Sequence, residues 1–156
     1  MRNDDVIKSI RFILDVNDAA IAEILKLGGY NPSRDEVAYI FEEPAENKEK
    51  VDITHTITAH FLDGLIIHKR GKDDKYPPRP ITVPVNNNTV LKKLRVAFQL
   101  RDEDIIQILK ETGFNISKNE LSALFRDNKH RNFKICGDQL LRYFLKGLAM
   151  RERKRI

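Results

Sequence analysis

The sequence has one cysteine and no tryptophan, and it lacks an apolar run of about 18 residues, the length that a membrane-spanning helix needs. A single cysteine, Cys136, excludes a framework of internal disulfides, so we expect a reduced, cytoplasmic location. The missing apolar run excludes a transmembrane helix. The chain starts Met1-Arg2-Asn3-Asp4-Asp5, without the apolar segment of a signal peptide, and we therefore expect none.

The residues that are present are sufficient for a packed core in a short chain. The 156 residues are 41% hydrophobic and 33% charged. This length allows one ordinary domain or two small ones and excludes a large multidomain enzyme. The composition is not that of a disordered or collagen-like chain.

Charge is distributed unevenly along the chain, whose net charge is +5. Residues 1–78 carry 11 Lys/Arg and 15 Asp/Glu, whereas residues 79–156 carry 17 and 8, a net charge of +9. Such asymmetry can mark a surface for nucleic acid or for an acidic protein. The alternative is a solvated helix end whose cations complement the helix dipole.

The chain contains an internal repeat. At an offset of 84 residues, positions 3–41 match positions 87–125, with 14 of 39 pairs identical. After a loop the register shifts by one, and residues 61–65 match residues 144–148. Two copies of about 70 residues indicate a duplicated unit rather than a solenoid, which needs at least about three repeats.

Each copy reads as four helices. Apolar residues recur at helical spacing, Asn3 is a candidate N-cap, and Ser33 with Glu36 forms a capping box that Ser117 and Glu120 repeat. The fourth helices are predicted to carry the stripes Ile53, Ile57, Phe61, Leu65 and Cys136, Leu140, Phe144, Leu148.

Two further features concern packing and domain organisation. Gly64 and Gly147 fall at equivalent places inside the fourth helices, which predicts a close approach of another helix. Residues 72–86 contain a proline-rich stretch that favours an extended linker. We therefore expect an all-α fold of two homologous four-helix units, residues 1–71 and 87–156. Arg11 with Asp18 and Arg95 with Asp102 are predicted to orient helices.

Three kinds of chemical site can be weighed. The histidines His55, His60 and His68 lack the i, i+4 pairing of a helical zinc site, so no metal or cofactor is expected. Cys136, with His130 upstream, lies on an apolar stripe, which favours a buried, inert thiol over a nucleophile. The segment Lys69-Arg70-Gly71-Lys72 lacks phosphate-loop spacing and is interpreted as a helix end capped by glycine.

Binding of nucleic acid is the remaining alternative. The second and third helices of each copy could form a helix-turn-helix, but the third helix begins Arg34-Asp35-Glu36 in the first copy, and these carboxylates repel phosphates. A better candidate is a positive surface on the last helix of the second copy and its tail, with Lys134, Arg142 and Lys146 along one helix face. Its predicted members are Lys134, Arg142, Lys146, Arg151, Arg153, Lys154 and Arg155.

The duplicated unit resembles the YehS-like family of bacterial proteins, which is defined by a duplicated domain of unknown function. The resemblance covers about residues 3–150 and implies a cytoplasmic bacterial protein with an all-helical duplicated fold, but no activity. The motif residues that carry it have no known role: Lys69, Arg70, Gly71, Lys72, Asp73, Asp74, Asn87, Lys92, Arg95, Cys136, Gly137, Asp138 and Gln139.

From these observations we expect a non-enzymatic binding or adaptor module with a protein partner. The alternative is a nucleic-acid-binding protein that uses the basic second copy and tail. An enzyme is less favoured because no convincing catalytic set is present.

Overall fold

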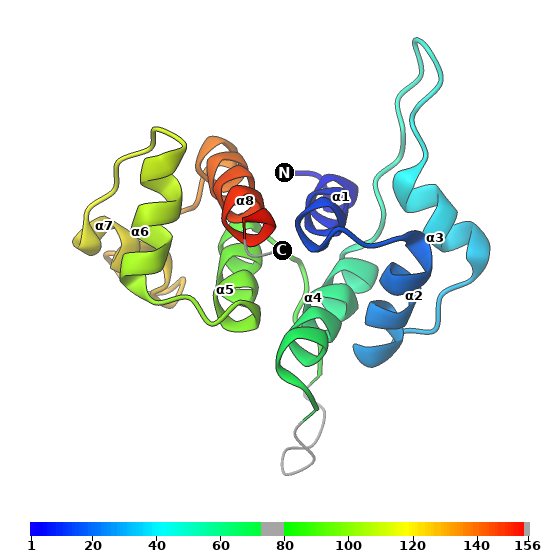
Figure 1. Ribbon diagram of the computed structural model, residues 1–156, viewed down its shortest axis with the longest axis horizontal. Helices are drawn as coiled ribbons and strands as arrows, with labels where there is room; N and C mark the ends of the chain where they lie inside the picture. The colour runs from blue at the N-terminus through cyan, green and yellow to red at the C-terminus, as the bar shows by residue number, and fades with distance from the viewer. Residues whose placement is uncertain (73–79, 155–156) are drawn as a thin grey trace. The chain divides into compact units, whose positions relative to one another are not determined.

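The computed structural model describes residues 1–72 and 80–154. Within them it contains eight α-helices and no strand, and the chain divides into two compact units, Met1–Val85 and Asn86–Ile156. Each unit has four helices (Figure 1). The predicted all-α fold with an internal duplication is therefore confirmed.

The helices follow the predicted order. The first unit consists of α1 (Asn3–Leu14), α2 (Asp18–Leu27), α3 (Arg34–Phe41) and α4 (His55–Arg70). In it α2 packs on α4, and α1 contacts both α3 and α4. The second unit consists of α5 (Asn87–Ala97), α6 (Asp102–Glu111), α7 (Lys118–Leu124) and α8 (Asp138–Arg153). Here α6 packs on α8, and it also contacts α7.

The two units use the same local chemistry at their helix ends. After α2 the N–H of Tyr30 donates to the Leu25 carbonyl at 2.9 Å, and after α6 the N–H of Phe114 donates to Leu109 at 2.9 Å. In both units the chain turns at a glycine with positive φ, Gly29 (93°) and Gly113 (89°), a conformation that glycine adopts without a Cβ clash. These repeated Schellman motifs explain why the repeat is so clear in the sequence.

The apolar stripes form the cores, with one adjustment. Phe61, Leu65, Phe144 and Leu148 are fully buried, as expected. However, α4 begins at His55 and α8 at Asp138, so the buried residues Ile53 and Cys136 precede the helices. The N-caps are Thr54 and Gly137, which end the extended segments.

One capping prediction needs correction, and the predicted linker makes a contact that was not foreseen. Asn3 is not the N-cap of α1: the helix begins at Asn3, and the Asp52 carboxylate accepts from the Asn3 and Asp4 N–H groups at 2.8 and 3.0 Å. The first compact unit also extends beyond residue 71. Val85 is buried, and its N–H donates to His55 Nδ1 at 3.1 Å, so the end of the predicted linker packs with the first unit.

Candidate interaction surface

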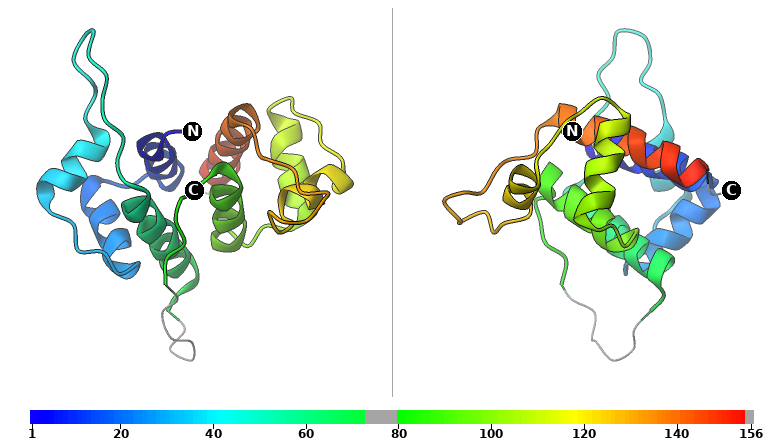
Figure 2. Two further views of the ribbon diagram at one scale, coloured as in Figure 1. Left: turned by 180° about the vertical axis from the view of Figure 1, so that it is seen from behind. Right: turned by 60° about the vertical axis from the view of Figure 1, so that its left-hand side comes forward.

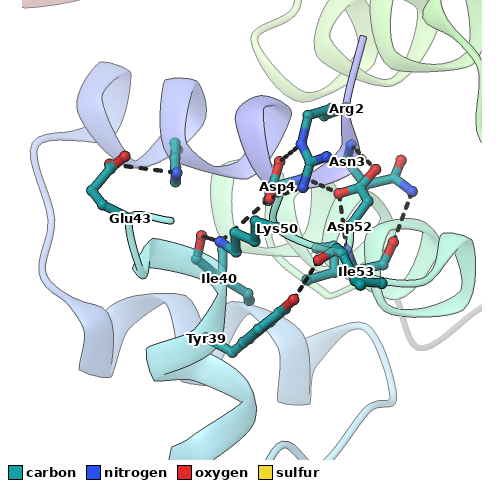
Figure 3. Close-up of polar contacts among 11 residues, drawn as sticks. Arg2, Asn3, Asp4, Tyr39, Ile40, Glu43, Lys50, Asp52 and Ile53 are labelled. Carbon is teal, nitrogen blue, oxygen red and sulfur yellow. Dashed lines mark hydrogen bonds and ion pairs between the residues drawn. The ribbon is translucent and has the colours of Figure 1, made fainter. Parts of the chain in front are cut away.

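A buried polar cluster holds the first unit together (Figure 3). The Asp4 carboxylate is 1% exposed and contacts Lys50 Nζ at 3.3 Å and Arg2 at 2.9 Å. Lys50, itself 8% exposed, also donates to the Ile40 carbonyl at 3.0 Å. Burial alone would raise the pKa of Asp4, but the hydrogen bonds from Arg2 and Lys50 outweigh it and hold the pKa at about 2. The cluster joins α1 to the α3–α4 segment and is internally paired.

In the second unit a single residue makes the corresponding contacts. Asn88 occupies the place of Asp4, and its amide donates to Leu124 O at 3.0 Å and Lys134 O at 2.9 Å. Its oxygen accepts from the Cys136 N–H at 2.9 Å. Neither Asp4 nor Lys50 was anticipated from the sequence. The one available signal was the exchange of aspartate for asparagine at equivalent positions of the repeat.

Four of the predicted cations lie on α8, and all of them except Arg151 are exposed. Arg142, Lys146 and Arg153 are exposed, while Leu141, Phe144, Leu145 and Leu148 on the other side of the helix are buried. We call Arg142, Lys146 and Arg153 the basic stripe. None of the ion pairs found among the described residues involves Arg142 or Lys146, although the Asp138 carboxylate, one turn before Arg142 on α8, interacts with it electrostatically. The equivalent positions in α4 are Ala59 and Asp63, so this cationic character belongs to the second unit.

The other predicted members of the surface do not belong to this stripe. Lys134 precedes α8 and pairs with Glu120 at 3.8 Å, so its predicted place on the helix is wrong. Arg151 lies on α8 but is 26% exposed and pairs with Asp104 at 3.3 Å. Lys154 is exposed beyond the helix end, and Arg155 lies outside the described residues.

Residues considered for catalysis and metal binding are occupied by structural contacts. Burial raises the pKa of the Cys136 thiol to about 11, with a smaller contribution from Asp138. His60 Nδ1 donates to the Gly28 carbonyl at 2.7 Å, and His130 Nδ1 accepts from the Asn132 N–H at 3.0 Å. The described part of the chain contains no group of three potential metal ligands.

The family-motif residues are spread over both units. Lys69 and Arg70 lie in the last turn of α4, and Gly71 ends that helix with a φ of 85°. Asn87 begins α5 and donates to Cys136 O and Asp138 Oδ1 at 3.0 and 2.7 Å. Lys72, Lys92, Gly137 and Gln139 are exposed, and Asp73 and Asp74 lie outside the described residues.

The two predicted ion pairs are present, Arg11 with Asp18 in the first unit and Arg95 with Asp102 in the second. Arg95 contacts Asp102 at 2.8 Å and lies over the Phe125 ring, with its guanidinium carbon 4.7 Å from the ring centroid. Arg11 likewise pairs with Asp18 and lies over Phe41 at 4.0 Å. Each arginine thus joins the first helix of its unit to the second helix and to the C-terminal end of the third.

A groove of about 420 Å³ lies between α2 and α3. Its lining includes Ala19, Ala22 and Ala38, together with Glu23 and Lys26, which pair with each other at 3.2 Å. Within the described residues, no helix is both long and apolar enough to cross a bilayer.

Comparison with known proteins agrees with the duplicated architecture. The model of a family described as "Protein of unknown function (DUF1456)" matches residues 3–71 and again residues 87–154. The chain is 42% identical over 154 residues to the uncharacterised protein YehS of Escherichia coli (strain K12), and this match covers 97% of each chain. No solved structure matches significantly. The resemblance to the YehS-like family is thereby confirmed, and the chain belongs to the DUF1456 family.

Proposed function

We propose that this protein is a non-enzymatic adaptor whose second unit binds an acidic segment of a protein partner along the basic stripe of α8. The observation that carries the proposal is the exposure of Arg142 and Lys146 on one helix face without an ion-pair partner among the described residues. Elsewhere in the second unit, Arg95, Lys134 and Arg151 are engaged by acidic side chains.

The geometry of the stripe defines the kind of partner. With a rise of about 1.5 Å per residue, Arg142 and Lys146 lie about 6 Å apart along the helix and Arg153 about 16 Å from Arg142. The spacing of Arg142 and Lys146 suits a short segment with two carboxylates. Electrostatic complementarity of this kind favours specificity and rapid association more than high affinity.

An acidic protein is a better candidate than nucleic acid. The helix that would enter a DNA groove carries acidic residues in its first turn, namely Asp35 and Glu36 in α3 and Glu120, after Lys118, in α7. These carboxylates would face the phosphates. The absence of tryptophan removes one of the side chains on which single-stranded bases stack.

Support for a non-enzymatic role comes from the state of the reactive groups. Cys136 is buried with a raised pKa, and Asp4, the most buried carboxylate of the polar cluster, is paired with cations. The groove between α2 and α3 is lined in part by alanines and by the paired side chains Glu23 and Lys26. None of these arrangements presents a nucleophile beside a base.

Fluorescence polarisation of the full chain tests the proposal. One probe is a labelled Ala/Glu peptide helix with glutamates four residues apart, and the second is a labelled 20-nucleotide single-stranded DNA. We expect the peptide to bind with a modest salt dependence. Arg142→Glu with Lys146→Glu should abolish this binding and change the free energy of unfolding by no more than about 0.5 kcal/mol.

The control is Lys110→Glu with Lys118→Glu, which makes the same charge change at exposed sites of the same unit. This variant should still bind the peptide. Peptide binding that survives the α8 substitutions would contradict the proposal. Tight DNA binding that falls steeply with salt, with no peptide binding, would favour the nucleic-acid alternative instead.

A further inference from the structure

The two units carry equivalent loops of opposite charge. Residues 42–51, the acidic loop, follow α3 and contain four glutamates and two lysines; residues 126–135, the basic loop, follow α7 and contain four Lys/Arg and one aspartate. Each loop extends beyond the helices of its own unit (Figures 1 and 2). The repeat has thus kept the position of the loop while its charge has diverged.

Internal contacts leave part of each loop's charge available. In the acidic loop Lys50 is buried against Asp4, which removes one cation from the surface. Glu46 and Glu49 are exposed and have no ion pair with any described cation. In the basic loop Lys129 and Arg131 are exposed and likewise have no described acidic partner.

Each loop also ends in an exposed branched apolar side chain. Val51 is 78% exposed and Ile135 is 76% exposed, the highest values among the exposed large hydrophobic residues, and they lie three and two residues before the N-caps Thr54 and Gly137. A single exposed apolar residue is ordinary on a protein surface. Two such residues, each at the end of one of two loops of opposite charge, form a complementary pair of features.

Both apolar side chains are attached to well-anchored backbone. Asn88 binds the Lys134 carbonyl and the Cys136 N–H, the groups on either side of Ile135. In the first unit, the residue after Val51 is Asp52, whose carboxylate is held by two N–H groups of α1. Side chains presented from a fixed backbone lose less entropy on binding.

We propose that the acidic loop of one chain docks on the basic loop of a second copy of this chain, with Val51 packed beside Ile135 and the charges arranged around them. Because each chain carries both loops, two copies can pair reciprocally, with each acidic loop on the other copy's basic loop, or chains can add head-to-tail until a ring closes. Exposed ion pairs are individually weak and are screened by salt, so the association is weak and favoured at low ionic strength. This interaction uses other residues than the basic stripe and is independent of the proposed function.

Sedimentation equilibrium over a wide range of chain concentration tests this association. In low salt the average mass of the unmodified protein should rise with concentration above the 18.1 kDa of a single chain, and it should return to that value in 0.5 M NaCl. Two double variants are compared. In the first, Glu46→Lys with Glu49→Lys, both loops of the chain are basic. In the second, Lys129→Glu with Arg131→Glu, both loops are acidic. Each variant alone should remain monomeric, and an equimolar mixture of the two should associate again.

Recovery in the mixture is the decisive result because a misfolded variant would not restore binding. Ile135→Ser should weaken association of the unmodified sequence several-fold with little change in its salt dependence. Lys110→Glu with Lys118→Glu is the matched control and should associate normally. A protein that stays monomeric at all concentrations in low salt overturns the proposal. A mixture of the two variants that fails to associate also overturns it. This includes the case in which both variants melt early because the loops pair within one chain.

Discussion

Gly64 of α4 lies against the carbonyl oxygen of Ile24 in α2, so closely that a Cβ built on the glycine would overlap that oxygen and lie 2.9 Å from the backbone nitrogen of Gly28. The two helices therefore touch through their backbones. The second unit has a looser version of the same crossing. A Cβ on Gly147 would lie 2.5 Å from the Ile108 carbonyl oxygen, and Thr112 takes the place of Gly28.

The first prediction follows from this difference. Gly64→Ala should lower the free energy of unfolding by about 3 kcal/mol and Gly147→Ala by about 1–2 kcal/mol, because overpacking forces the helices apart. Gly137→Ala is the control, since a Cβ there meets nothing within 4 Å, and its effect should stay below about 1 kcal/mol. Urea denaturation measures all three. Equal stability of the Gly64 and Gly137 variants would show that the crossing tolerates a methyl group.

The repeat made much of this fold predictable. Caps, glycine turns and apolar stripes occur twice at a fixed offset, so each prediction was supported by its copy. Gly64 and Gly147 were assigned to close helix contacts on that basis, and the structure confirms it. The capping serines Ser33 and Ser117 also accept hydrogen bonds as predicted, from the N–H groups of Glu36 and Glu120.

Contacts between residues distant in sequence are harder to predict from local patterns. Asp52 completes the N-terminus of α1 from about 50 residues away, which no local pattern reveals. Lys50 lies in a segment rich in charged residues that reads as solvated, yet its side chain is buried against Asp4. Helical spacing likewise placed Lys134 on the last helix, although the chain is still extended there and the helix begins at Asp138. Spacing alone cannot locate a helix start when the N-cap is a glycine.

The second prediction concerns the thiol. Because burial raises the pKa of Cys136 to about 11, the native protein should react with Ellman's reagent at pH 8 at least about a hundredfold more slowly than the urea-unfolded chain. The denatured protein supplies the control for total thiol. Rapid labelling of the native protein would contradict the buried state and reopen a reactive role for this residue.

The third prediction concerns the arginines that join helices. Arg95→Ala should lower the free energy of unfolding by about 1–2 kcal/mol, because it removes both the ion pair with Asp102 and the contact with the Phe125 ring. Arg95→Lys should recover only part of this loss, since lysine keeps the charge but not the planar group. Thermal melts of the two variants at low and high salt separate the contributions. A lysine variant as stable as the parent would mean that charge alone matters.

The fourth prediction concerns acid stability. The folded pKa of Asp4, about 2, lies below its ordinary value of 3.8, so folding favours the ionised form. The corresponding stability, about 2 kcal/mol, is complete above about pH 4 and is lost as the pH falls through 2. The difference in unfolding free energy between the parent and Asp4→Asn should therefore shrink from pH 5 to pH 2. A difference that stays constant would show that the carboxylate is not held ionised by Arg2 and Lys50.

The last prediction uses the second unit as a template for the first. Asp4→Asn alone should destabilise by about 3–5 kcal/mol, because Lys50 then remains buried without its anionic partner. Lys50→Met alone should also be costly, since it leaves the buried carboxylate with Arg2 as its remaining cation. In the second unit, however, the Asn88 amide reaches the Leu124 carbonyl directly, and Leu124 is equivalent to Ile40.

The combined variant, Asp4→Asn with Lys50→Met, should therefore be more stable than the sum of the single losses predicts, by at least about 2 kcal/mol. The new amide can donate to the Ile40 carbonyl that Lys50 vacates, and the methionine fills the space of the lysine stem. Urea denaturation of the four proteins gives the coupling energy at pH 7. Strong coupling would show that the asparagine of the second unit can replace the Asp4–Lys50 pair of the first. Strictly additive effects would show that the two units fix the start of their first helix by unrelated contacts.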